Sequence, residues 1–158
     1  MKKILFFILG FTLIFSDSYK VIKVSDGDTI TVMSLQQYNK FKVRLYGIDA
    51  PESDQSFGTQ SKQFLSDQIL NREIELEIKD TDRYKREVAI IFLNNVNING
   101  LMVKEGWAWW YEAYAKKDLV YKELQEEAQA KKRGMWSKKG NIPPWEYRKA
   151  KKKGEVRL

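Results

Sequence analysis

The sequence predicts a single α+β domain, and three observations carry the prediction. Five short segments alternate apolar and polar side chains, the period of two that is typical of strands with one buried face. Three longer segments space their apolar residues as helices do, one of them between the third and fourth strands. A chain of 158 residues has room for one domain with one sizeable core. The strands are expected at residues 19–24, 29–33, 41–46, 72–79 and 84–93, and the helices at residues 57–70, 98–105 and 119–133.

The third and fourth strands have the clearest patterns. Residues 41–46 place apolar side chains at every second position, so that Arg44 should face away from the core. In residues 72–79 glutamates alternate with apolar residues. The apolar residues, including Ile78, should all face the core. The last helix should bury a stripe of apolar residues that starts at Val120 and recurs every four residues.

The first 18 residues have the pattern of a secretory signal. Two lysines precede an apolar run at residues 4–15, and small residues then offer a cleavage site before Tyr19. The run is shorter than the about 20 residues that a membrane span takes. We therefore expect a protein that is secreted or lies in the cell envelope or periplasm. An uncleaved signal that anchors the chain to a membrane remains an alternative.

The remainder divides into a folded domain at residues 19–145 and a basic end at residues 146–158. The domain should close with residues 141–145, a Pro-Trp segment that is expected to dock without forming a helix. Five of the six residues in 148–153 are charged, which predicts a mobile basic tail. Near a nucleic acid such a tail would add salt-sensitive affinity.

The charge balance points toward anionic partners. Lys and Arg number 28 against 21 Asp and Glu, which gives a net charge of +7. Nucleic acid or a membrane surface would be attracted by this charge, although a merely soluble basic protein would have it too.

Two absent residue types exclude whole classes of chemistry. Without cysteine the chain has no disulfides and no thiolate nucleophile. Without histidine it has no Ser-His-Asp triad, no histidine-ligated zinc and no histidine-dependent nuclease site. Any chemistry must use carboxylates, Lys, Arg, Tyr or Ser, with oxygen atoms holding a metal if there is one.

One stretch, VRLYGIDAPE at residues 43–52, combines a cation with two carboxylates. Arg44 lies on the third strand, and the turn that follows leaves Asp49 and Glu52 on an irregular segment at the strand's end. Polar groups in such a segment can point at a ligand instead of pairing in a sheet. The turn SDGDT places Asp28 at the mouth of a second junction of this kind.

A third junction, DRYKR at residues 82–86, leads into the last strand. The motifs DGDTI, VRLYGIDAPE and TDRYKR, in this order and spacing, resemble the signature of the staphylococcal nuclease family. GWAWWY and GMW follow near the expected places, so the likeness runs from about residue 19 to residue 145. The resemblance implies a five-stranded OB-type β-barrel with about three helices packed around it.

The resemblance also implies a Ca²⁺ site with few protein ligands. Asp28 and Asp49 match the family's carboxylate ligands, and Ala50 stands where the family contributes a backbone carbonyl. Hard oxygen donors suit Ca²⁺, and a small protein ligand set leaves room for water and phosphate. Taken one at a time, both aspartates could equally be ordinary turn residues.

Two arginines and one glutamate match the family's catalytic positions. Arg44 and Arg86 would clamp the phosphodiester and stabilise the extra charge of its transition state. Glu52 would accept a proton from the attacking water, or order water and metal instead. The alternative reading is of surface cations and a turn glutamate.

The resemblance assigns substrate contacts to aromatic residues. Tyr84 would lie near the terminal phosphate, beside Lys85, while Tyr111 and Tyr114 would border the nucleotide pocket together with the adjacent Trp109 and Trp110. Packing in the core is the better expectation for the tryptophans at 107 and 136.

The turn before the last strand departs from the family. Lys85 and Glu87 flank the second arginine, where the family commonly has glycine. A positive φ would strain Lys85, and Glu87 could pair with Arg86 in competition with phosphate.

The expected function is that of a Ca²⁺-dependent nuclease that cleaves DNA and RNA and leaves 3′-phosphates. Exposed bases are needed for stacking on aromatics, so single-stranded or frayed substrate should be preferred. No protein partner is implied, and a monomer is expected. One alternative is an OB-type module that grips single strands without cutting, and another is an anchored protein whose tail meets anionic lipid.

Overall fold

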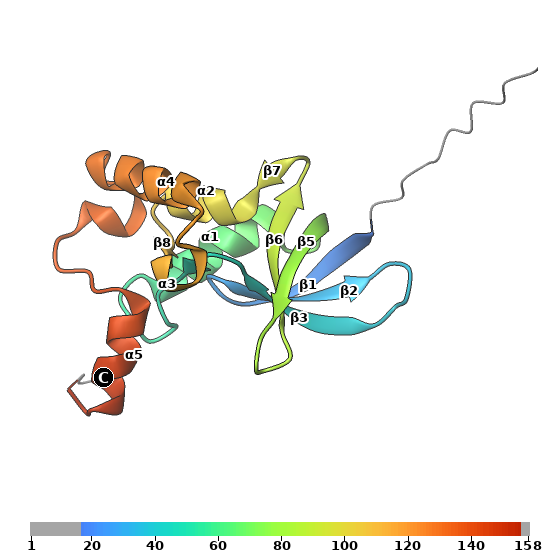
Figure 1. Ribbon diagram of the computed structural model, residues 1–158, viewed down its shortest axis with the longest axis horizontal. Coiled ribbons are helices and arrows are strands. Elements are labelled where there is room, and N and C mark those ends of the chain that lie inside the picture. The colour runs from blue at the N-terminus through green and yellow to red at the C-terminus, as the bar shows by residue number, and fades with distance from the viewer. Residues whose placement is uncertain (1–16, 156–158) are drawn as a thin grey trace, which may run out of the picture.

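The computed structural model describes residues 17–155, in which five strands close a barrel (Figure 1). The strands follow the order β3-β2-β1-β5-β6 with antiparallel neighbours, and a parallel pairing of β3 with β6 closes the ring. This arrangement confirms the predicted α+β fold with an OB-type barrel. The signal predicted for residues 1–18 lies outside the described residues except at its last two positions. The barrel strands are β1 (Ser18–Asp26), β2 (Thr29–Ser34), β3 (Lys40–Leu45), β5 (Glu73–Thr81) and β6 (Glu87–Leu93).

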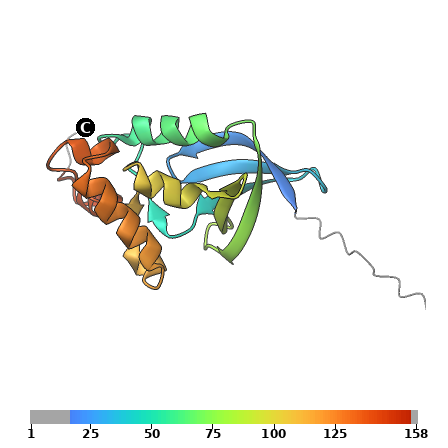
Figure 2. The same cartoon turned by 90° about the horizontal axis from the view of Figure 1, so that it is seen from above.

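The three predicted helices are present, and the structure adds further short elements. Among them, β4 pairs with β8 and so ties the segment after β3 to the chain after α2. Figures 1 and 2 both place the C-terminal helices beyond one end of the barrel. The described residues contain no helix long and apolar enough to cross a membrane. The helices are α1 (Gly58–Ile69), α2 (Ile98–Lys104), α3 (Glu112–Ala115), α4 (Leu119–Ala130), the 3₁₀ helix η1 (Gly134–Ser137) and α5 (Pro144–Lys152), and the short strands are β4 (Ile48–Asp49), β7 (Val96–Asn97) and β8 (Trp109–Trp110).

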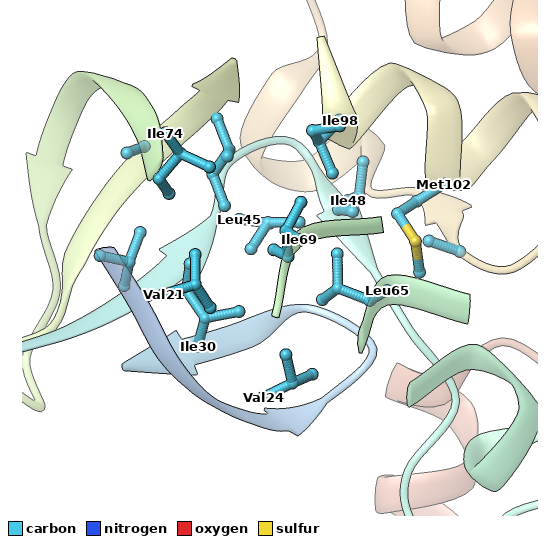
Figure 3. Packing of buried hydrophobic residues seen from close by; sticks show 14 of the residues in the cluster. Val21, Val24, Ile30, Leu45, Ile48, Leu65, Ile69, Ile74, Ile98 and Met102 are labelled. Carbon is cyan, nitrogen blue, oxygen red and sulfur yellow. The ribbon is translucent and has the colours of Figure 1, made fainter. Parts of the chain in front are cut away.

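The core lies inside the barrel and continues under α1 and α2 (Figure 3). Alternate residues of the strands, such as Val21, Ile30 and Leu45, point inward and are almost fully buried. Leu65 and Ile69, one turn apart on α1, cover one open end of the barrel. Burial on this scale, at about 25 cal/mol per Å² of apolar surface, provides the main driving force for the fold.

Two details of the predicted burial are wrong. Ile78 is 45% exposed, next to an irregularity in the register of β5 between Ile78 and Asp80. In α4 the predicted stripe is right at Leu124 and Ala128 but wrong at Val120, which is 65% exposed, and Tyr121 is buried in its place. The Tyr121 ring packs against Gly47, where a Cβ atom would lie 2.7 Å from it.

Two predictions for the C-terminal part are also wrong: residues 144 and 145 belong to a helix, and the basic residues that follow continue this helix and do not form a mobile tail. Pro144 is the first residue of α5, the helix position that proline favours because its missing N–H has no intrahelical partner there. Glu146 in the first turn and lysines in the last complement the helix dipole. Tyr147 is buried, and its hydroxyl donates to the Asp54 carbonyl at 3.0 Å. α5 is therefore docked on the loop that follows β4.

A buried asparagine fixes the end of β3 against β6. The side chain of Asn99 accepts a hydrogen bond from the Ile91 amide at 3.0 Å. It donates to the carbonyls of Tyr46 at 2.9 Å and Ala89 at 3.1 Å. All of its partners are backbone groups, and the Ala89 carbonyl also accepts a hydrogen bond from the Tyr46 amide at 2.8 Å. Asn99 thereby holds the backbone from which the site begins.

Candidate active site

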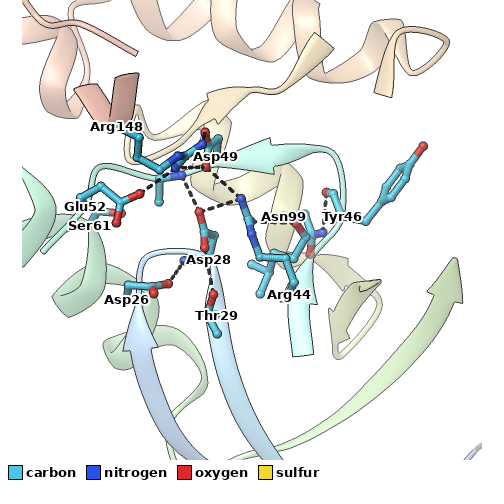
Figure 4. A network of polar contacts seen from close by, with 12 residues as sticks. Asp26, Asp28, Thr29, Arg44, Tyr46, Asp49, Glu52, Ser61, Asn99 and Arg148 are labelled. Atoms are coloured by element: carbon cyan, nitrogen blue, oxygen red, sulfur yellow. Dashed lines mark hydrogen bonds and ion pairs between the residues drawn. The ribbon is translucent and has the colours of Figure 1, made fainter. Parts of the chain in front are cut away.

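Three of the predicted site residues contact one another at one end of the barrel (Figure 4). The Nη2 atom of Arg44 lies 3.1 Å from Asp28 Oδ2 and 2.9 Å from Asp49 Oδ1. Asp28 Oδ2 also accepts a hydrogen bond of 2.6 Å from the Ala50 amide. Asp28 and Asp49 are 6% and 1% exposed. The structure thus brings together a cation on β3 and two buried acids, one in the turn before β2 and one on β4.

A glycine allows this close approach. A Cβ atom on Gly27 would lie 1.9 Å from Ser61 Oγ on α1 and 2.7 Å from the Ala50 Cβ. The turn is therefore pressed against both neighbours, and Asp28 is held beside Ala50. On its other side the Thr29 hydroxyl donates to Asp28 Oδ1 at 3.1 Å.

A third acid, Asp26, increases the negative charge of the cluster. Its Oδ1 accepts a hydrogen bond from the Asp28 amide at 3.1 Å. Burial, together with the charge of Asp28, raises the pKa of Asp26 to about 7. Burial likewise raises the pKa of Asp49, although hydrogen bonds from Arg148 oppose the rise. Such a cluster favours cations.

Arg86 approaches from the side of Thr29. Its Nη1 lies 3.5 Å from Thr29 Oγ1, and its Nε donates to Asp82 Oδ2 at 2.7 Å. The competing acid is therefore Asp82 and not Glu87, which accepts a hydrogen bond from Thr81. The Thr29 hydroxyl therefore lies between Arg86 and Asp28 and is within hydrogen-bonding distance of both.

The strain expected in this turn is present. Lys85 has φ of 61°, the left-handed conformation that glycine adopts without cost. Next to it Tyr84 is 65% exposed, and its ring centre lies 5.5 Å from the guanidinium carbon of Arg86. Tyr84 therefore borders the arginine side of the site, while Lys85 makes the turn.

The two tyrosines of the expected nucleotide pocket lie together. The ring centres of Tyr111 and Tyr114 are 4.9 Å apart, and Tyr114 is 73% exposed. The Tyr111 amide donates to the Gly47 carbonyl at 2.9 Å, which places it beside the turn before Asp49. Its other face is covered, because the Trp145 ring stacks on it at 5.2 Å with an interplanar angle of 9°.

The tryptophans have mainly structural contacts. Trp107 packs against the core and against Phe64, and Trp136 packs against Trp109 with ring centres 4.3 Å apart, as predicted for both. Trp109 also meets Trp145 at 5.9 Å, and the Trp110 indole donates to a carbonyl. Neither Trp109 nor Trp110 presents a free ring face comparable to that of Tyr114.

Sequence reasoning missed Arg148, which α5 brings to the site. Its Nη2 lies 2.7 Å from Asp49 Oδ2, and its Nη1 lies 3.2 Å from Asp49 Oδ1 and 2.7 Å from Glu52 Oε1 (Figure 4). Glu52 is thus joined to the cluster through this guanidinium. The helix itself had a signal in Pro144 and the lysines of its last turn, but no local pattern reveals a partner 99 residues away.

The donor set fits a hard cation that is only partly ligated by protein. Among residues 17–155 no group of three or more acidic side chains is arranged to hold a metal. Carboxylate oxygens of Asp28 and Asp49 and the carbonyl of Ala50 would hold Ca²⁺, and water or phosphate would complete its shell. Two guanidinium groups lie at 2.9 Å and 2.7 Å from the Asp49 carboxylate, which is therefore already surrounded by positive charge.

Fold and site together define an OB-type barrel protein with a buried cluster of acids and arginines at one barrel end. The family model described as staphylococcal nuclease homologue matches residues 42–138. An uncharacterized endonuclease of Haemophilus influenzae is 43% identical over 133 residues, which cover 84% of this chain and 74% of that protein. The micrococcal nuclease of Shigella flexneri is 37% identical, with 84% and 81% covered, and protein ParB of Escherichia coli is 35% identical, with 82% and 78% covered. The chain belongs to the staphylococcal nuclease family.

Proposed function

We propose that this protein is a Ca²⁺-dependent nuclease that hydrolyses phosphodiester bonds in DNA and RNA and leaves 3′-phosphate ends. The convergence of Asp28, Arg44 and Asp49 within hydrogen-bonding distance carries the proposal. Membership of a nuclease family, with relatives named as a micrococcal nuclease and an endonuclease, supports hydrolysis of nucleic acid.

The arginines bind the phosphate in this proposal. Arg44 is 15% exposed and Arg86 is 25% exposed, so both guanidinium groups act in partly dehydrated surroundings, where electrostatic attraction is stronger than in water. Each offers forked donors that match phosphate oxygens. Because the charge on phosphorus oxygens grows in the transition state, the same donors bind that state more tightly than the substrate.

Asp28, Asp49 and the Ala50 carbonyl hold the metal. When bound, Ca²⁺ supplies positive charge that polarises the phosphate and orients water. Glu52 is 38% exposed and lies on the solvent side of the buried acids, where it takes the proton from the attacking water or orders that water. To do either, Glu52 has to be released from Arg148.

Exposed rings favour single strands as substrate. Tyr114 is 73% exposed, and Tyr84 is 65% exposed with Arg83 and Arg86 packed over its ring; stacking on an aromatic face contributes about 1–3 kcal/mol per base. Bases in an intact duplex are stacked on each other, so frayed or single-stranded ends fit better. The net charge of +7 raises the rate of encounter with any nucleic acid.

We further propose that the protein acts as a monomer outside the cytoplasm. The pattern of residues 1–18 supports secretion or delivery to the periplasm. Retention of that segment would anchor the same domain to a membrane instead.

The test is cleavage of denatured DNA in Ca²⁺ and in a chelator, with Arg86→Gln and Glu52→Gln beside the parent. Arg72→Gln is the matched control, because it removes the same charge from an exposed residue in the turn before β5. Cleavage by parent and control in Ca²⁺, with a loss of about 100-fold or more in Arg86→Gln, is expected. Binding of single strands without cleavage by the parent would favour the binding module. Equal cleavage by all variants would show that the site is misassigned.

A further inference from the structure

One residue of α5 occupies the ion-binding half of the candidate site. Arg148 contacts both carboxylate oxygens of Asp49 and one oxygen of Glu52 at 2.7–3.2 Å. A Ca²⁺ ion approaches carboxylate oxygens to about 2.3–2.6 Å and brings its own shell of water. Guanidinium and hydrated ion would therefore need the same space beside Asp49 Oδ2.

Another residue of α5 occupies the base-binding half. The Trp145 ring stacks on Tyr111 nearly parallel, at 9° and 5.2 Å between centres. A nucleobase would adopt this arrangement on an open tyrosine face. One helix thus covers a proposed metal ligand and a proposed stacking platform, three residues apart in its own sequence.

α5 is attached by the rings of Trp145 and Tyr147 and by a small set of polar contacts, and part of this attachment is open to water. Tyr147 bonds to the Asp54 carbonyl, Lys151 pairs with the Asp54 carboxylate, and Gln55 Nε2 donates to the Ile142 carbonyl at 2.8 Å. A hollow of about 340 Å³ lies between the loop and the segment that leads into α5, lined by Pro51 and Tyr147 among others. The side chain of Arg148 is 40% exposed. Detaching α5 would leave the barrel core intact.

The charge of α5 matches the proposed substrate. Arg148 is followed by lysines at 149, 151, 152 and 153, so one short helix and its end carry five positive charges. A nucleic acid offers phosphates to these side chains in exchange for the carboxylates of Asp49 and Asp54.

We propose that α5 is a displaceable strap: Arg148 and Ca²⁺ are alternative occupants of the space beside Asp49 Oδ2, and the metal binds only when the strap has left. This inference rests on the proposed function for the identity of the metal. Ca²⁺ affinity is then reduced by the fraction of molecules whose strap is detached. The freed basic helix remains tethered beside the site and binds the phosphates of the substrate.

The test is calorimetric titration of Ca²⁺ into the full chain and into Arg148→Gln. Lys149→Gln is the matched control, since it removes an equal charge from an exposed residue of the same helix. Arg148→Gln should bind Ca²⁺ about tenfold more tightly than the parent, and Lys149→Gln should remain within about twofold of it. Equal affinity in all three proteins, weaker binding by Arg148→Gln, or no binding of Ca²⁺ by any of them would overturn the strap.

A second measurement uses the parent alone and does not depend on the folding of a variant. Hydrogen exchange of the α5 amides, residues 145–152, is compared in Ca²⁺ and in chelator. Exchange of the α5 amides should accelerate about tenfold or more in saturating Ca²⁺, while exchange of the β2 and β3 amides should not accelerate. Unchanged or slower exchange of α5 in Ca²⁺ would also overturn the strap.

Cleavage assays separate this inference from the proposed function. If the parent cuts denatured DNA in Ca²⁺ but Arg148→Gln gains no affinity, the strap fails and the nuclease stands. If Arg148→Gln gains affinity and α5 opens but none of the proteins cuts DNA or RNA, the strap stands and the nuclease fails.

Discussion

Two arginines hold the same aspartate, and they belong to very different parts of the molecule. Arg44 reaches Asp49 from five residues away, on a strand whose backbone is paired with β2 and β6 on its two sides. Arg148 reaches it from 99 residues away, on a helix attached through a loop. Their side chains are 15% and 40% exposed. The barrel thus provides a permanent cation, while α5 provides one that can be exchanged.

Removal of the permanent cation should have the largest effect on activity. Arg44→Gln leaves Asp28 and Asp49 facing each other without their shared partner and removes a donor to the transition state. Cleavage of denatured DNA in Ca²⁺ should fall by about 100- to 1,000-fold. Initial rates beside the Arg72→Gln control measure this. If Arg44→Gln kept most of the parent's cleavage rate, Arg44 would not be the permanent cation on which activity depends.

The backbone that supports Arg44 should be intolerant of change. Asn99→Ala leaves buried groups of Tyr46, Ala89 and Ile91 without their side-chain partner. The free energy of unfolding should fall by about 2–4 kcal/mol, as for other buried groups that lose their hydrogen bonds. Urea denaturation measures it, with Gln129→Ala on the exposed side of α4 as the control. A loss below about 1 kcal/mol would mean that the β3 end is not pinned in this way.

The acid cluster should make stability depend on pH. Folding raises the pKa of Asp26 from 3.8 to about 7, so between these values the folded protein binds more protons than the unfolded chain. Stability therefore falls as pH rises through this window. In chelator, Asp26→Asn should be more stable than the parent at pH 8, by about 1–3 kcal/mol, and the difference should vanish below pH 4. The amide oxygen can still accept the bond from Asp28, which isolates the charge. Parallel curves of unfolding free energy for the two proteins would contradict this explanation.

Weakening the strap should have the smallest effect on the fold. Tyr147→Phe removes the hydroxyl that donates to the Asp54 carbonyl and keeps the buried ring. The free energy of unfolding should change by about 1 kcal/mol or less, because α5 can detach while the barrel remains folded. The variant should cut at least as fast as the parent when Ca²⁺ is limiting. A loss of several kcal/mol in urea denaturation would show that α5 belongs to the same cooperative unit as the barrel.

The barrel and the C-terminal helix also differ in how much of their structure could be predicted from the sequence. Strands with a buried face show it as alternation, so the strands and the junctions that hold Asp28, Arg44 and Asp49 were predictable, while the barrel was implied by the family resemblance. Ile78 and Val120 were misplaced because the exposure of a residue near the end of a strand or helix depends on which elements pack against it. Residue types and their spacing suggested the cluster, while the contact distances come from the fold.

The C-terminal helix escaped prediction because its signals conflict. Two prolines and a run of lysines are typical of an extended, solvated end, yet Pro144 begins a helix and Tyr147 anchors it. Whether such a segment docks depends on Asp54 and Asp49 across the loop, far away in sequence. Long-range charge pairs of this kind leave no local periodicity to detect.

The most direct measurement is a crystal structure with Ca²⁺ and a short single-stranded thymidine oligonucleotide, using Glu52→Gln to slow cleavage. Our account predicts the ion against Asp28, Asp49 and the Ala50 carbonyl, a phosphate between Arg44 and Arg86, and Arg148 withdrawn from Asp49. An ion bound elsewhere, or a phosphate that neither Arg44 nor Arg86 contacts, would contradict the account.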